Sequence, residues 1–103
     1  MHRVVRTDRA DENLIEIWSY IAADSAESAD RTLDAIERRW RQLGEFPLSG
    51  LARDDIAPGV RCLVVGNYLT LHLVGADVIT ILRVLHARRK IDRASIKDLP
   101  GLR

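Results

Sequence analysis

The sequence predicts an α+β protein in which two helices precede a small, mainly antiparallel sheet. Residues 78–86 combine β-branched residues and leucine with neither Gly nor Pro, which is typical of an interior strand. Two similar segments, residues 60–65 and 68–74, precede it and are joined by short Gly-containing turns. Before these lie two stretches whose apolar residues recur every three or four positions, as in amphipathic helices.

Length and composition predict one domain over residues 1–103. The 16 Lys and Arg residues nearly balance the 15 Asp and Glu residues, so no global field attracts nucleic acid or membrane, and we expect no sequence-specific DNA binding. The single Cys62 cannot form an intrachain disulfide. With no signal-peptide core at the start and no apolar stretch of ~20 residues, we expect a soluble, cytoplasmic protein.

The first half of the chain predicts a strand followed by a helix hairpin. Residues 2–6 are β-prone, and Thr7 or Asp8 can cap the first helix. Asp24, with Glu27 three residues later, resembles a capping box for the second helix, and Gly44 can end that helix in a left-handed conformation. We expect the two apolar stripes to face the sheet together: Leu14, Ile17, Trp18 and Ile21, then Ala29, Leu33, Ile36, Trp40 and Leu43.

The second half predicts a long loop over residues 45–59 and then three antiparallel strands. In the middle strand we expect Leu69, Leu71 and Leu73 to face the helices, which places Tyr68, Thr70 and His72 on the open side. The residues after Arg89 are compatible with a short C-terminal helix that ends at Pro100 and Gly101. Because residues 78–86 are apolar on both faces, we expect the helix hairpin to cover one face and another protein to cover most of the other.

No glycine-rich nucleotide loop and no metal-ligand spacing is present, so the sequence predicts neither a cofactor nor a metal site. His86 ends the last strand beside Arg88 and is a candidate general acid or base, although a local hydrogen bond is the commoner role. Arg83 lies between apolar residues and needs a carboxylate, carbonyl or phosphate partner. The cationic run 88–90 is either a solvated end or a grip for phosphates or an acidic protein patch.

These features resemble the RelE/ParE toxin superfamily of type II toxin–antitoxin systems. The order strand, helix hairpin, Pro47-x-x-Gly50, Gly59-Val-Arg61 and Tyr68 is similar to the superfamily, and the ending ILRVLHARR at residues 81–89 is similar to its ParE branch. The resemblance implies a non-enzymatic toxin that binds DNA gyrase, is neutralised by a ParD-like antitoxin and forms a toxin–antitoxin hetero-oligomer. Partner contacts are then expected from Arg61, Tyr68, His72, Arg83, His86, Arg88 and Arg89.

The RelE branch implies an alternative, a ribosome-dependent mRNA endoribonuclease with His86, Arg83 and Arg61 as its active groups. The sequence has Leu63 and Leu69 where that branch commonly has cationic residues, and no Tyr follows Arg89. Several cations are needed to stabilise a cleaving phosphodiester, so the ribonuclease is the second choice. Departures from the ParE pattern are His72 in place of a frequent Tyr and Lys90 in place of a frequent Asp. A third reading is an inert or purely regulatory family member.

Overall fold

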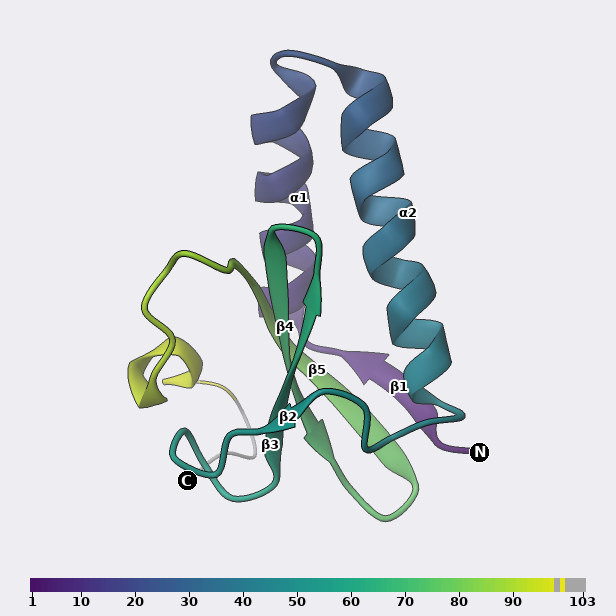
Figure 1. Cartoon of the computed structure of the whole chain (residues 1–103), viewed down its shortest axis with the longest axis vertical. Helices are drawn as coiled ribbons and strands as arrows, with labels where there is room; N and C mark the ends of the chain where they lie inside the picture. The colour runs from purple at the N-terminus through teal and green to yellow at the C-terminus, as the bar shows by residue number, and fades with distance from the viewer. Residues whose placement is uncertain (98, 100–103) are drawn as a thin grey trace.

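A computed structural model describes residues 1–97 and 99 (Figure 1). Its elements are β1 (Arg3–Arg6), α1 (Asp8–Ala22), α2 (Ala26–Leu43), β2 (Leu51–Ala52), β3 (Val60–Val65), β4 (Tyr68–Val74), β5 (Val78–His86) and the 3-10 helix η1 (Arg93–Ile96). The sheet order is β1-β5-β4-β3-β2, with β1 parallel to β5 and every other pair antiparallel. The predicted α+β class and order are confirmed, and β2 is an addition within the expected loop.

A polar side chain caps the N-terminus of each helix of the hairpin. The Thr7 hydroxyl accepts a hydrogen bond from the Ala10 amide at 3.0 Å and caps α1, as predicted. Ser25, rather than the predicted Asp24, caps α2 by accepting from the Ser28 amide. Gly44 is right-handed (φ −59°), so the predicted left-handed end is wrong. A Cβ there would lie 2.9 Å from the His2 carbonyl oxygen, so the close passage of the chain at His2 leaves no room for a larger residue than glycine.

The first core lies between the helix hairpin and the sheet. Its buried members are Ala10, Leu14, Ile17, Ile36, Trp40, Leu43, Leu63, Ile79, Ile81 and Val84. The Trp40 indole nitrogen donates a buried 2.9 Å hydrogen bond to the Thr70 hydroxyl. Trp18 is not in this core, because it is 37% exposed and its indole nitrogen donates to Asp30 instead. Because Thr70 accepts the hydrogen bond from Trp40, the side of β4 that carries Thr70 is the side that faces the helices.

The predicted faces of β4 are wrong, and β5 does not alternate strictly along its length. Thr70 and Tyr68 face the helices, whereas Leu69 and Leu71 belong to a second core on the opposite face. In β5 the register jumps opposite Leu71 and His72, so Leu82 has no partner residue in β4. Strict alternation fails at such a bulge. As a result Ile81 and Val84 face the helices while Leu82 and Leu85 join the second core.

The second core is closed by the protein's own chain. Leu71 and Leu82 are 0% and 1% exposed, and they pack with Ile56 from the 53–59 loop and with Ile96 and Leu99. The expectation that another protein covers this face is therefore wrong. Residues 91–97 and Leu99, hereafter the tail segment, contain the predicted C-terminal turn as a 3-10 helix, while Pro100 and Gly101 lie outside the described residues.

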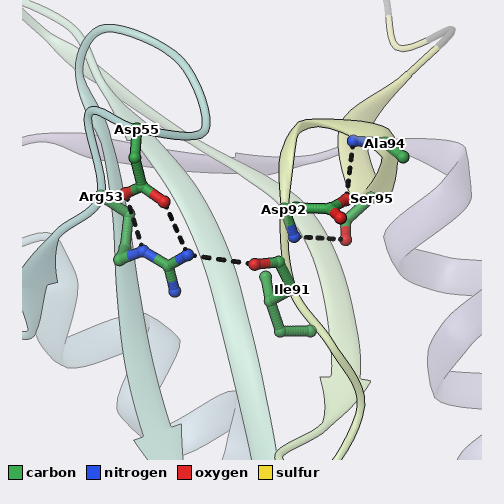
Figure 2. A network of polar contacts seen from close by, with 6 residues as sticks. All are labelled: Arg53, Asp55, Ile91, Asp92, Ala94 and Ser95. Carbon is green, nitrogen blue, oxygen red and sulfur yellow. Dashed lines mark hydrogen bonds and ion pairs between the residues drawn. The ribbon is translucent and has the colours of Figure 1, made fainter.

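Figure 2 shows how the tail segment is held against the 53–59 loop. The Arg53 guanidinium forms two 2.9 Å hydrogen bonds to the Asp55 carboxylate and donates a third, at 3.0 Å, to the Ile91 carbonyl oxygen. Asp92 caps η1 by accepting from the Ala94 amide, and the Ser95 hydroxyl accepts from the Asp92 amide.

Within the described residues, no helix is long and apolar enough to cross a membrane.

The Trp40–Thr70 bond predicts a specific loss of stability. We expect Thr70→Val to lower the free energy of unfolding by about 1–3 kcal/mol, because the substitution preserves volume but leaves the buried indole N–H without an acceptor. Urea denaturation provides the measurement. Thr80→Val is the matched control on β5 and should change stability by less than about 0.5 kcal/mol. Equal effects of the two substitutions would contradict the assigned role of Thr70.

Candidate functional site

A pocket of about 740 Å³ lies between α1 and the end of β5, and polar groups gather in it. Four of the predicted partner-binding residues line it together: Tyr68, His86, Arg88 and Arg89. The other polar residues of the lining are Asn13, Glu16 and Tyr20 of α1, Thr32 of α2 and Asn67 of the β3–β4 turn. The pocket is brought together because Tyr68 pairs with His86 in the β4–β5 ladder, directly under the C-terminal half of α1.

The polar side chains at the β5 end of this pocket are mainly hydrogen-bond donors, whereas Glu16 on the α1 wall is an acceptor. The Tyr68 and His86 rings meet edge to face, with centroids 5.5 Å apart. Burial, and secondarily the neighbouring Tyr20, raises the pKa of Tyr68, so its phenol stays protonated. His86 Nδ1 accepts the Arg88 amide N–H at 3.1 Å, which places the proton of the neutral ring on Nε2. Together with two guanidinium groups, these donors suit a carboxylate or carbonyl oxygen of a bound partner.

Arg83 does not take part in this pocket. It is 7% exposed, and its Nε donates to the Asn13 amide oxygen at 3.2 Å while Nη1 donates to the Ser95 carbonyl oxygen at 3.1 Å. The partners of Arg83 are thus a side-chain amide and a backbone carbonyl. A carboxylate, the other internal partner considered from the sequence, is not among its described contacts. Burial, followed by Arg9 and Arg89, lowers the pKa of Arg83, although a guanidinium remains charged at neutral pH.

Arg61 and His72 face each other across β3 and β4 at the far end of the sheet. The Arg61 guanidinium donates to the carbonyl oxygens of Leu48 and Gly50 at 2.7 and 2.9 Å and so holds the turn before β2. His72 is fully buried, and neither ring nitrogen has a hydrogen-bond partner in the described structure. The expected place of His72 on an open side of the sheet is therefore wrong, and the buried ring is not presented to a partner.

The three groups of the predicted ribonuclease are consequently apart. His86 lies opposite Tyr68 and Arg61 lies opposite His72, four residues further along β4, or roughly 13 Å at the usual rise of a strand. Arg83 lies opposite Leu71, whose side chain is in the second core, and its guanidinium is occupied by Asn13 and Ser95. The structure thus gathers the cations and aromatic rings at the end of β5 but does not join them to Arg61 or Arg83.

Sequence reasoning missed Asn13, Glu16, Tyr20 and Asn67. Asn13 is 4% exposed on a helix, and its amide oxygen accepts from both the Val84 amide and Arg83. The only signal for it was a polar residue one position before the apolar stripe of α1. Tyr20, which is 80% exposed, stands on the polar side of that helix and gave no signal at all.

Comparison with known proteins decides the family. The family described as "ParE toxin of type II toxin-antitoxin system, parDE" matches residues 4–91. The chain belongs to the ParE toxin family. Among curated ParE toxins, it is 35% identical to Toxin ParE1 of Mycobacterium tuberculosis, covering 88% of this chain and 95% of that protein. It is 28% identical to Toxin ParE3 of Caulobacter vibrioides, covering 88% and 92% respectively.

Solved structures agree with the ParE assignment. The chain matches a chromosomal ParDE toxin–antitoxin system from P. aeruginosa with a TM-score of 0.71 and 25% identity, covering 84% of this chain and 96% of that one. It matches the toxin–antitoxin complex RelBE2 from Mycobacterium tuberculosis with a TM-score of 0.54 and 25% identity, covering 82% and 90%. The resemblance to the ParE branch of the superfamily is confirmed, and the chain is a type II toxin of that branch.

The buried His72 predicts an acid-dependent loss of stability. Burial, and then the Arg61 charge, lowers its pKa from 6.5 to about 4, so the unfolded chain binds the proton more readily. The His72 contribution is therefore constant above pH 6.5, and stability falls as the pH drops from 6.5 toward 4, by about 2 kcal/mol at pH 5. Urea denaturation at several pH values should show this slope in the wild type and a flatter one in His72→Leu. Identical slopes would contradict the buried neutral imidazole.

Proposed function

We propose that this ParE-family toxin acts in the cytoplasm by binding DNA gyrase without catalysing a reaction, and that a cognate antitoxin neutralises it in a hetero-oligomer. The observation that carries the proposal is the separation of His86 from Arg61 and Arg83, which leaves a donor-rich pocket beside an exposed cationic end. Such a surface suits recognition of an acidic protein patch better than cleavage of a phosphodiester. The ParE names of the relatives support a gyrase target, and the solved toxin–antitoxin assemblies support an antitoxin partner.

The state of His86 supports a binding role. A general base at this position needs a free lone pair on the exposed ring nitrogen, but in the neutral ring Nε2 carries the proton because Nδ1 accepts from the Arg88 amide. Stabilisation of a cleaving phosphate also needs cations around the scissile bond, and the two other predicted cations are engaged elsewhere. The remaining cationic and phenolic groups bind anions and carbonyls, and the one carboxylate in the described lining, Glu16, belongs to the α1 wall of the pocket.

Gyrase inhibition predicts a charge-dependent effect on supercoiling. Purified toxin should reduce supercoiling by gyrase and increase covalent cleavage complexes. Arg88→Glu with Arg89→Glu should weaken both effects at least about tenfold, because two acidic side chains at the pocket rim would repel an acidic patch of the partner. The matched control is Arg38→Glu with Arg41→Glu on the exposed surface of α2, which should retain activity. Unchanged supercoiling at micromolar excess of the wild-type toxin would exclude gyrase as the target.

The ribonuclease alternative is favoured only by the exposed His86 beside two arginines and by the RelBE2 likeness. It predicts new transcript 5′ ends after induction. It also predicts that His86→Ala lowers the rate of mRNA cleavage by about 10²-fold or more. A binding toxin should produce no such ends, and His86→Ala should cost less than about tenfold in growth inhibition. Mapped cleavage sites that disappear in His86→Ala would replace the binding proposal. Normal growth on induction without any antitoxin would instead favour an inert family member.

A further inference from the structure

A second hollow adjoins the pocket at the end of β5. It has a volume of about 390 Å³ and lies between α2 and the β3–β4 turn. One wall is a stripe of α2 with three- and four-residue spacing and the other is the tip of the hairpin: Ser28, Arg31, Thr32 and Ala35, then Val65, Gly66, Asn67 and Tyr68. Thr32, Asn67 and Tyr68 line both hollows. The two hollows are therefore compartments of one depression, hereafter the trough.

The β3–β4 turn leaves the border between the two compartments open at Gly66. This residue has a left-handed φ of +58°, and a Cβ built on it would meet no heavy atom within 4 Å beyond its chain neighbours. Val65 pairs with Tyr68, and the Asn67 carbonyl oxygen accepts from the Ala87 amide at 2.8 Å. The turn is thus held to the sheet and to the segment after β5, and a bound chain has room to cross it.

Cations stand in both compartments of the trough. Arg88 and Arg89 line the first compartment, and Arg31 lines the second. The Arg31 guanidinium is 4.0 Å from the Glu27 carboxylate, but both groups are exposed, so this contact neutralises little. Among the described lining residues, Glu16 is the one acidic side chain, and it belongs to the first compartment. The trough therefore presents positive charge at two separate places.

The lining between these cations is apolar and aromatic. It consists of Ile17, Ile21, Val84 and Leu85 in the first compartment, Ala35 and Val65 in the second, and the shared Tyr68. The planes of the Tyr68 and His86 rings cross at 71°, so the two rings do not form a continuous surface on which bases stack. Glu16 also repels a phosphate backbone. The trough thus suits a protein segment with acidic and apolar side chains better than a nucleic acid.

We propose that the trough binds one continuous segment of the target protein that carries two acidic groups, one for the arginines after β5 and one for Arg31, with apolar side chains between them. This inference rests on the proposed function and extends its pocket to α2. A protein with a single acidic group would fill the first compartment and leave Arg31 without a partner, so the second compartment selects among acidic proteins. Arg31 is thereby a specificity-determining residue.

Two pairs of variants test the second compartment. Arg31→Glu reverses its charge, and Arg38→Glu, at an exposed position of α2 that lines neither compartment, is the control. Gly66→Asp adds a carboxylate at the open border, and Gly66→Asn is its isosteric, uncharged control. Both Asp and Asn tolerate a left-handed backbone better than other side chains do. Circular dichroism reports whether each variant is folded.

The probe is a capped peptide with a pair of Glu residues at each end of an apolar spacer, compared with a peptide in which one pair is replaced by Gln. Spacers of roughly three to seven residues cover the unknown span, because an extended chain advances about 3.3 Å per residue. At the best spacer, isothermal titration calorimetry should show that the wild type binds the two-ended peptide at least about tenfold more tightly. Arg31→Glu and Gly66→Asp should each lose this advantage, and both controls should keep it.

Three results overturn the proposal. The first is equal affinity of the wild type for the two peptides at every spacer length. The second is an equal loss in a test variant and its control. The third is tighter binding of a single-stranded oligonucleotide than of either peptide, abolished in Arg31→Glu, because the trough then holds a nucleic acid.

Purified gyrase and antitoxin separate this inference from the proposed function. Arg31→Glu should weaken gyrase inhibition at least about tenfold and still bind the antitoxin. A toxin that inhibits gyrase equally well as Arg31→Glu contradicts the trough alone. A wild-type toxin that prefers the two-ended peptide but leaves gyrase unaffected contradicts the proposed function alone. Loss of antitoxin binding with full gyrase inhibition in Arg31→Glu would assign the trough to the antitoxin and overturn the proposal.

Discussion

The buried guanidinium of Arg83 joins the helix hairpin, the sheet and the tail segment. Its Nε donates to Asn13 of α1 and its Nη1 donates to the Ser95 carbonyl oxygen, while Arg83 itself is part of β5. Asn13 also accepts from the Val84 amide, so one amide oxygen bonds the edge of β5 beyond the end of β1 and accepts one of the two described hydrogen bonds that Arg83 donates. Removing a partner from a buried charge typically costs about 3–5 kcal/mol. The arrangement around Arg83 therefore fixes where α1 and the tail segment lie.

This constraint decides which surfaces are free for partners. Because Arg83 and Arg53 anchor the tail segment, Ile96 and Leu99 cover the second face of the sheet and no partner is needed to close it. Two of the described pockets lie at borders of the sheet. One is the pocket at the end of β5, with Tyr68, His86 and the two following arginines, and the other lies between the β3–β4 turn and α2. Tyr68 lines both, so the surface offered to a partner continues from β5 across the turn to α2.

The sequence predicted the fold well where a periodic pattern coincided with turn signals. The bounds of β3, β4 and β5 follow from Gly66-Asn67 and the Gly75–Asp77 turn, and the helix stripes follow from their three- and four-residue spacing except at Trp18, which is 37% exposed. It failed on which face of β4 meets the helices, because both faces are buried and hydrophobicity cannot rank them. The faces are set by the Trp40 indole, which donates its buried hydrogen bond to Thr70, and by the bulge at Leu82.

The candidate site was predictable in part for the same reason. Tyr68, His86, Arg88 and Arg89 are close in the sheet register or in sequence, so they meet once β4 and β5 pair, although on the helix side of the sheet and not on the open side expected for Tyr68. The roles of Arg61, His72 and Arg83 were not predictable, because they depend on irregular segments that carry no period: the turn at Leu48–Gly50, and the tail segment with its Ser95 carbonyl. Asn13 was missed because a single amide on a helix is ordinary until the strand edge beside it is known.

The structural role of Arg83 can be measured most directly by a double-mutant cycle with Asn13. The free energy of unfolding is determined for the wild type, Asn13→Ala, Arg83→Met and the double variant. If the guanidinium depends on the Asn13 amide, the double variant should be more stable than the sum of the single losses by at least about 1.5 kcal/mol. Losses that add within about 0.5 kcal/mol would show that the two side chains act independently, and Arg83 would then be free for another role.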